Sequence, residues 1–498
     1  MGKNWDGLKT RLEEIRAVEE ALILFEWDNE TLAPAGAMGL TAETVEKLSG
    51  IYFRMMTDPR LDECLKACRQ ETLSVEQQAV VRETEKKRED LVKIPREEYE
   101  AYSGLTARAA SVWSKAREER NFDLFAPVLQ EILQYRKRFA SYKAKEGQAL
   151  YDVMLDEFEE GFSMEKLDRF FGLLKGEIVP LLRQIEEEGT PCPADFLKGD
   201  YPEEKQEELG RFLAEYVGFD FRRGVMAVSA HPFTTALHNH DVRFTTHYDS
   251  FLDHSAFSVI HESGHGIYEQ GIGDSITRTP AGEGASMGMH ESQSRFFENM
   301  IGRSLAFWEP IYPKVQSLFP EQLGNVGLEE FYRAVNRVEP GPIRIDADEL
   351  TYSLHIMVRY ELEKGLVAGE IRVEDLPGLW EEKYEEYLGV RPENVSQGVL
   401  QDIHWSQGSI GYFPSYALGS AFAAQIFARM EEEMDVEGLL KNGRLDVIRE
   451  YLREHIHRFG KMKTSRELLK ETTGKEFDPS FYVNYLKRKF SRLCGLNR

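Results

Sequence analysis

The stretch AFSVIHESGHGIYEQ, residues 256–270, holds two histidines four residues apart, with a glutamate directly after the first. On a helix, His261 and His265 project from the same face, one turn apart. This spacing lets both imidazoles bind one metal ion at about 2.0–2.1 Å. Glu262 projects about 100° further round the helix, so it suits a general base acting on a water beside the metal rather than a ligand. The stretch therefore predicts a buried helix that carries the zinc centre of a hydrolase.

The alternative is a chance occurrence of a short motif on a buried helix. Gly264 and Gly266 favour this alternative, because each costs about 1 kcal/mol in a helix relative to alanine. The distribution of histidines argues against it, since eight of the 12 histidines lie between residues 231 and 290. One core histidine needs no metal, but a cluster in so short a part of the chain favours a metal site.

A catalytic zinc ion needs a third protein ligand and one open position. The metzincin pattern, with a third histidine six residues after His265, is excluded because Gly271 stands there. We expect a glutamate from a following helix instead, and Glu291 is the best placed, near the start of HESQSRFFENMIG (residues 290–302). The apolar residues of this stretch would dock the helix on the core: Phe296, Phe297 and Met300. The alternative for Glu291 is a solvated acid at a helix start, and the other candidate ligands are Glu298, Glu269 and Glu283.

Hydrolysis at such a centre also needs a donor that stabilises the oxyanion of the tetrahedral intermediate. Glu262 would take a proton from the attacking water and pass it to the leaving amine. The segment DIHWSQGSIGYFPSYALG (residues 402–419) offers His404, Tyr412 and Tyr416 as candidate donors. Each of them can equally be an ordinary core residue, and the residues alone do not decide between them.

Most of the chain has the three- and four-residue apolar spacing of amphipathic helices. Ser163 is expected to cap one of these helices, and Pro180 to kink or break it. Residues 225–249 are rich in β-branched and aromatic residues around an Asn-His-Asp turn, which predicts a small antiparallel sheet. We expect one mostly α-helical catalytic domain over residues 1–498, two-lobed around a groove with the sheet beside it. The predicted helices include residues 5–27, 75–93, 123–146, 164–188, 203–217, 350–365, 417–434 and 445–459.

The formal net charge of −24 makes nucleic acid an unexpected partner, because an acidic surface repels phosphate backbones. Four cysteines in 498 residues do not form a disulfide framework. The apolar run ALILF near the N-terminus is too short for a signal sequence or a membrane span. These features predict a cytoplasmic protein that is not bound to a membrane.

Short motifs are spread over nearly the whole chain: WDNETLAPAGA (27–37), YDVMLDEFEEG (151–161), HPF (231–233), DVRFT (241–245), HESGH (261–265), HESQ (290–293), IRIDAD (343–348) and GVLQDIHW (398–405). Together, and in this order, they resemble the carboxypeptidase Taq family of HEXXH zinc metallocarboxypeptidases. This resemblance implies zinc held by His261, His265 and Glu291, with Glu262 as general base. It also implies a mostly helical fold similar to that of the neurolysin and angiotensin-converting-enzyme group.

The resemblance further implies a homodimer that removes single residues from peptide C-termini with broad specificity, with Co²⁺ able to replace Zn²⁺. A carboxypeptidase must bind a free carboxylate, which an arginine fork fits well. Arg344 is the expected clamp, and Arg243 either binds substrate or pairs with Asp241. His231 and His238 are expected to face substrate or to support the metal ligands.

Arg295 stands where thermolysin-like enzymes carry an aspartate that supports a zinc-binding histidine. Support for the two histidines is therefore expected from elsewhere, with His290, Asp346 or Asp348 as the candidates.

Two other functions compete with a carboxypeptidase. An oligopeptidase or dipeptidyl carboxypeptidase would share the metal chemistry and differ in how the groove ends. A helical peptide-binding protein with a vestigial site would have no use for a general base, so the presence of Glu262 argues against it.

Overall fold

The computed structural model describes residues 2–496, and their backbone forms two compact units built from interleaved segments. Unit 1 comprises Met1–Val92, Ala194–Tyr332 and Arg429–Glu476. Unit 2 comprises Lys93–Pro193, Arg333–Ala428 and Phe477–Arg498. The fold is mostly helical with one small sheet, as predicted. Among the described residues, no helix is long and apolar enough to cross a membrane.

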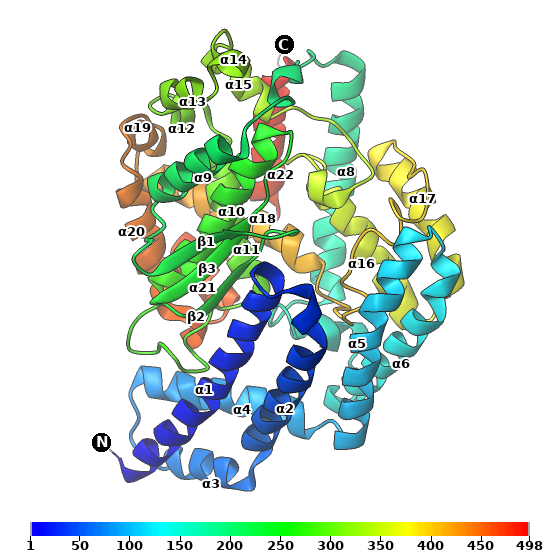
Figure 1. The fold of residues 1–498 in the computed structure, drawn as a ribbon, viewed down its shortest axis with the longest axis vertical. Coiled ribbons are helices and arrows are strands. Elements are labelled where there is room, and N and C mark those ends of the chain that lie inside the picture. Colours follow the sequence, from blue (N-terminus) through cyan, green and yellow to red (C-terminus); the bar gives the residue numbers. More distant parts are fainter. Residues whose placement is uncertain (1, 497–498) are drawn as a thin grey trace. The chain divides into compact units, whose positions relative to one another are not determined.

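The centre of unit 1 is α10 (Leu252–Gly271), the helix predicted from residues 256–270. It packs against α9 (Glu203–Val217), α11 (Met287–Arg295) and the sheet (Figure 1). The two glycines that weaken the helix prediction have packing reasons. A Cβ on Gly264 would lie 2.7 Å from the Gln293 carbonyl oxygen on α11, and one on Gly266 would lie 2.6 Å from the Phe219 ring. Close approach of neighbouring elements therefore explains both glycines.

The sheet lies against α10 and has the strand order β1-β3-β2, from β1 (Gly224–Val228), β2 (Thr234–His238) and β3 (Asp241–Thr246). The β2–β3 pair is antiparallel, as predicted, but β1 pairs with β3 in parallel. The prediction of an entirely antiparallel sheet is therefore wrong. The connection from β1 to β2 passes round the end of β3, where Ser229 N donates to Thr246 O (3.1 Å) and Thr245 N donates to Phe233 O (2.9 Å). This path places β2 on the far side of β3.

Unit 1 contains further helices, of which α1 contacts β2 and α13 contacts α9. A loop after α10 is fastened by Glu283, which forms ion pairs with Lys87 on α4 and with Lys461, each at 2.6 Å. In the last part of the long N-terminal helix α1, the Trp27 ring packs on the Phe233 ring, with centroids 5.6 Å apart. These helices are α1 (Lys3–Thr31), α2 (Met38–Thr57), α3 (Pro59–Cys68), α4 (Val75–Val92), α12 (Leu305–Trp308), α13 (Tyr312–Leu318), α14 (Pro320–Leu323), α15 (Leu328–Val335, which runs into unit 2), α19 (Val436–Lys441), α20 (Leu445–His455) and α21 (Ser465–Thr473).

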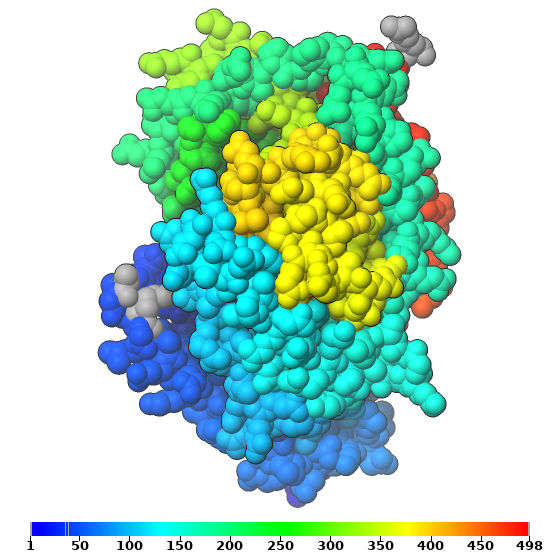
Figure 2. Space-filling model, turned by 90° about the vertical axis from the view of Figure 1, so that its right-hand side faces the viewer, coloured from blue at the N-terminus to red at the C-terminus, as the bar shows by residue number. Residues whose placement is uncertain are grey.

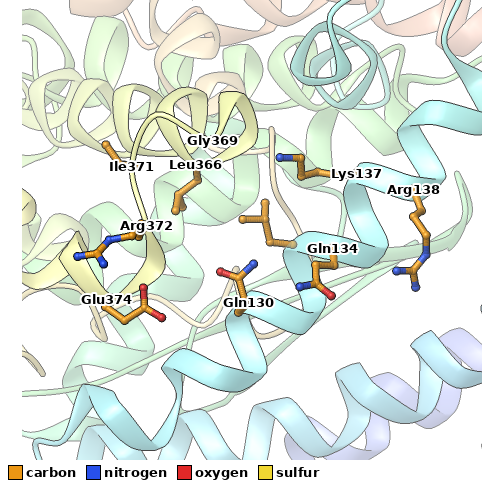
Figure 3. A pocket seen from close by; sticks show the side chains of 10 residues that line it. Gln130, Gln134, Lys137, Arg138, Leu366, Gly369, Ile371, Arg372 and Glu374 are labelled. Atoms are coloured by element: carbon orange, nitrogen blue, oxygen red, sulfur yellow. The ribbon is translucent and has the colours of Figure 1, made fainter.

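The described residues of unit 2 form helices and loops and no strand. In Figure 2 the cyan atoms of the α5 and α6 region lie beside the yellow atoms of the segment around α17. Trp113 Nε1 on α5 donates to the Leu400 carbonyl at 3.1 Å. A hollow between α6 and the end of α16 is lined by residues such as Lys137, Leu366 and Glu374 (Figure 3). The elements are α5 (Arg96–Glu118), α6 (Ala126–Lys143), α7 (Leu150–Asp156), α8 (Met164–Glu188), α16 (Tyr352–Ala368), α17 (Leu376–Leu388), α18 (Pro414–Glu433, which runs into unit 1) and α22 (Ser480–Leu493).

Helix α8 corrects two details of the prediction. It continues through Pro180 without a break. Pro180 is exposed, so water can solvate the carbonyl that its ring displaces, while buried Ile178 and Leu181 hold the helix to the core on both sides. The Ser163 side chain does not cap the helix, because Asp152 Oδ1 accepts from Met164 N at 2.7 Å instead.

Candidate metal centre

Three predicted ligands converge in unit 1. Glu291 Oε2 lies 3.6 Å from His261 Nε2 and 3.4 Å from His265 Nε2. Among the described residues, this is the one group of three such side chains whose ligand atoms all lie within 4.8 Å. Ligand atoms of one tetrahedral zinc ion, at bonds of about 2.0–2.1 Å, stand about 3.3 Å apart. The two separations from Glu291 are close to this value, so the donor set fits a single divalent ion.

The partners of the ring nitrogens occupy Nδ1 of both histidines, so their Nε2 atoms would be the ones to bind a metal ion. His261 Nδ1–H donates to Glu298 Oε2 at 2.8 Å. His290 Nε2–H donates to Glu269 Oε1 at 2.8 Å, so its Nδ1 is left to accept from His265 Nδ1–H at 2.6 Å. A histidine that donates through Nδ1 has its Nε2 free for a metal.

Of the three candidates for supporting His261 or His265, His290 is the one that the structure places against a candidate ligand, His265. Glu298, weighed as a ligand, supports His261 instead. Asp348, another candidate for supporting a histidine, lies in unit 2. Its carboxylate accepts from Leu350 N (2.9 Å) and Thr351 N (3.0 Å) just before α16. Asp346 stays a prediction.

Arg295 balances the acidic side of the centre. Its Nε donates to Glu291 Oε1 at 2.8 Å, and its second nitrogen donates to Glu298 Oε2 at 3.0 Å. Burial would raise the pKa of Glu291, but Arg295 and the two histidines outweigh burial and hold that pKa well below its usual range. Burial, aided by the nearby histidines, lowers the pKa of His265 to about 3. A charged carboxylate and a neutral imidazole are the forms that bind a metal.

Glu262 is next to His261 in the sequence, but its carboxylate is not part of the group of three candidate ligands. Its side chain is buried, and its Oε2 accepts from the Thr234 hydroxyl on β2 at 2.6 Å. Burial raises the pKa of Glu262, which His261 and the Thr234 bond partly offset. A carboxylate with a raised pKa that is held in place by one oxygen has the properties of a general base. Nothing in the sequence pointed to Thr234, because it meets α10 only through the fold.

The predicted substrate residues of unit 1 lie on the sheet and in the loop between β1 and β2. His231 is exposed in the loop between β1 and β2, and its carbonyl accepts from the Ser229 hydroxyl at 2.6 Å. His238 ends β2, and its Nδ1 accepts from His240 N at 3.2 Å. Arg243 forms a bidentate pair with Asp241 at 2.8 Å for both bonds, which is the pairing considered as the alternative.

The other predicted residues gather in unit 2 around a carboxylate that was not predicted, Asp402. Arg344 is buried, and its Nε and one terminal nitrogen donate to Asp402 Oδ1 at 3.0 and 2.9 Å. Arg359, also buried, donates through Nε to Asp402 Oδ2 at 2.7 Å. Burial alone would raise the pKa of Asp402, but the two arginines hold it well below its usual range. Two fixed cations on one carboxylate make this a rigid cluster.

His404, Tyr412 and Tyr416 lie close together within this unit. His404 Nε2 is 3.0 Å from the Tyr416 hydroxyl, and the ring centroids of His404 and Tyr412 are 5.4 Å apart. Burial lowers the pKa of His404 to about 3, so its imidazole is neutral at neutral pH. A neutral imidazole that donates its Nε2–H to a phenol oxygen does not use the phenol O–H, which can then donate to another acceptor.

Comparison with known proteins places the chain in a family. The family model "Carboxypeptidase Taq (M32) metallopeptidase" matches residues 7–490. Carboxypeptidase 1 of Bacillus subtilis (strain 168) is 40% identical over 486 residues, which is 97% of each chain. Thermostable carboxypeptidase 1 of Thermus thermophilus is 37% identical over 94% of each chain.

Solved structures agree. The M32 carboxypeptidase from Deinococcus radiodurans R1 superposes with a TM-score of 0.96 at 36% identity, over 99% of this chain and all of that one. Trypanosoma cruzi metallocarboxypeptidase 1 gives 0.93 at 34% identity, over 98% and 99% of the two chains. The chain therefore belongs to the carboxypeptidase Taq (M32) family of metallopeptidases and is a metallocarboxypeptidase.

Proposed function

We propose that this enzyme uses zinc to remove single residues from the C-termini of peptides with broad specificity, with Glu262 as general base. The observation that carries the proposal is the convergence of two Nε2 atoms and one carboxylate oxygen beside a separate buried glutamate. Two histidines and a glutamate are the ligands of a well-known class of catalytic zinc site. The resemblance to the family supports Co²⁺ as a substitute, a homodimer and a cytoplasmic location.

Glu262 moves the protons in this proposal. A bound metal would supply an acidified water and polarise the peptide carbonyl. Glu262 takes the water's proton on Oε1, since Thr234 occupies Oε2. It then delivers this proton to the nitrogen of the leaving residue, so the carboxylate is regenerated within one turnover. We keep His404 and Tyr416 as the catalytic candidates for oxyanion stabilisation.

Release of one residue at a time requires recognition of a free carboxylate. Arg344 remains our proposed clamp, with Tyr412, His231, His238 and Arg243 as further substrate-binding candidates. Three of the five N–H groups of an arginine are used in Arg344, two on Asp402 and one on the Tyr352 hydroxyl. The two that are left would have to bind the substrate carboxylate.

A defined peptide followed by mass spectrometry, with and without a chelator, tests the proposal. We expect a ladder of products, each shorter by one C-terminal residue, that the chelator abolishes and added zinc restores. Release of dipeptides or internal fragments would replace the proposal with an oligopeptidase or dipeptidyl carboxypeptidase. A complete lack of cleavage with zinc or cobalt present would favour a peptide-binding protein.

A further inference from the structure

We propose that Glu363 is a positioning residue, which fixes the segment 402–416 in the shape that presents His404 and Tyr416. The inference rests on the proposed function, because it takes the catalytic roles of these two side chains from it. Glu363 is on α16, outside every motif noted in the sequence, and it is completely buried.

The carboxylate of Glu363 receives three hydrogen bonds. Trp405 Nε1 donates to Oε1 at 2.8 Å, and Gly411 N donates to Oε2 at 2.8 Å. The Tyr151 hydroxyl of α7 also donates to Oε2 at 2.8 Å. Each carboxyl oxygen of Glu363 accepts one N–H of the 402–416 segment, so one side chain binds two separate points of this segment and joins both to α7.

Helix α7 holds the same segment by packing. Gly411 has φ +94°, and a Cβ there would lie 2.9 Å from the backbone of Met154 on α7. Just beyond α7, the Phe158 ring meets the Tyr412 ring edge-on, with centroids 5.2 Å apart. The α7 motif YDVMLDEFEEG therefore has a physical role: it supports the segment from the side on which Glu363 binds it.

The third fixed point is Asp402, held by Arg344 and Arg359. His404 lies between the fixed points 402 and 405, and its Nε2 meets the Tyr416 hydroxyl at 3.0 Å. Loss of the Glu363 bonds would free the segment from residue 405 to 411 while Asp402 stays anchored. The His404–Tyr416 pair would then lose its fixed geometry.

The test is Glu363→Gln, which keeps the size of the side chain. An amide has one acceptor oxygen, so either Trp405 Nε1–H or Gly411 N–H must face an NH₂ group and stay unpaired in the core. The matched control is Glu361→Gln, two residues away on the same helix, where the carboxylate accepts from the Tyr387 hydroxyl at 2.8 Å. Trp405→Phe removes a single donor and provides a milder second variant.

We expect Glu363→Gln to lower kcat about 10- to 100-fold with KM within twofold and bound metal unchanged. This is less than the roughly 10²–10³-fold loss on removal of an oxyanion donor, because the donor is displaced and not deleted. Trp405→Phe should change kcat in the same direction by less, and Glu361→Gln should leave it unchanged. Combined with Tyr416→Phe, Glu363→Gln should cost little more, because both act through the same phenol. A kcat within twofold of the control, in a folded variant, would overturn the proposal.

Amide hydrogen exchange read by mass spectrometry separates this idea from the proposed function, because it needs no activity. We expect faster exchange in peptides covering residues 402–416 of Glu363→Gln, and no change in α10. Unchanged exchange in that segment refutes the positioning role even in an active enzyme. Faster exchange in a protein that releases no single residues would uphold the positioning and refute only the proposed function.

Discussion

The convergence of His261, His265 and Glu291 could be predicted from sequence, because their spacing is set by a regular helix and by one helix start. The place of Glu262 on the same helix follows from the same spacing. Glu298 is different. It lies in a π-helical turn, Phe296–Gly302, directly after α11. A π turn changes the 3.6-residue period, so the direction of the Glu298 side chain cannot be computed from its distance along the chain to Glu291. Its bond to His261 had to be seen in the fold.

Glu262→Gln should lower kcat by about 10²–10⁴-fold, the contribution of a general base. The amide keeps the shape of the carboxylate but cannot take a proton from water. Metal content should stay at the wild-type level, since Glu262 is not a ligand. Steady-state kinetics with metal analysis of the same samples checks both points, and near-normal activity would remove Glu262 from the mechanism.

Glu298→Gln should weaken metal binding about 10- to 100-fold, as loss of a partner to a metal-binding histidine typically does. The amide would replace the charge-assisted bond from His261 Nδ1 by a weaker one. Competition with a chelator measures the affinity. Glu309→Gln is the control, because Glu309 has an exposed ion pair with Lys441 at 3.9 Å, and an equal loss in both variants would contradict the assignment.

At the scale of elements, helices such as α8 and α9 were predicted with their full bounds because their apolar period is local information. The parallel pairing of β1 was not predicted, since it depends on the path of a loop round β3. The packing of α11 on α10 is intermediate: the sequence shows two glycines that weaken the helix, and the structure shows that they admit α11 and Phe219 at close range.

Gly264→Ala should destabilise the protein by about 1–3 kcal/mol, the usual cost of overpacking a core. The new Cβ would lie 2.7 Å from backbone atoms of α11, which cannot swing aside as a side chain can. Because α11 carries Glu291, metal affinity should fall as well. Gly172→Ala in α8 is the control, since a Cβ there meets nothing within 4 Å; denaturant unfolding of both variants gives the comparison, and equal stabilities would contradict the packing argument.

The ion pairs of Glu283 predict that the stability of the fold depends on pH. Burial would raise the pKa of Glu283, but Lys87 and Lys461 outweigh it and hold that pKa well below its usual range. The ionised group therefore stabilises the fold above the unfolded value, about 4.3, and this contribution is lost as the pH falls below it. The Tm of Glu283→Gln should lie well below wild type at pH 7, with the gap closing toward pH 3. A gap independent of pH would contradict this, and Glu339→Gln, in an exposed pair with Arg337, is the control.

At the scale of the whole molecule, two lobes were expected within one domain, but the segments that form each unit were not predicted. No flexible linker marks the points where the chain passes from one unit to the other. The metal ligands and Glu262 belong to unit 1, while Arg344, His404, Tyr412 and Tyr416 belong to unit 2. Helical periodicity reports how each segment folds and carries no information about which segments share a unit.

Metal removal should lower the Tm. A ligand that binds only the folded state adds about 2.7 kcal/mol at 100 times its Kd. Calorimetry with and without a chelator measures the shift, which should be reversed by added zinc. The control is His261→Ala, whose Tm should not respond to the chelator; a wild-type Tm equally insensitive to it would argue against tight binding at this centre.

The contact between His457 and Gln293 bears on when during synthesis the site can form. His457 Nε2 lies 2.8 Å from Gln293 Oε1, two residues after Glu291, and unit 1 takes its last segment from Arg429–Glu476. At about 5–20 residues per second, the ribosome needs on the order of 10–40 s to proceed from Glu291 to Glu476. During that interval the nascent chain holds all three ligands but lacks the segment that completes their surroundings. We therefore expect a metal ion to bind stably only after the chain has been translated almost to its end.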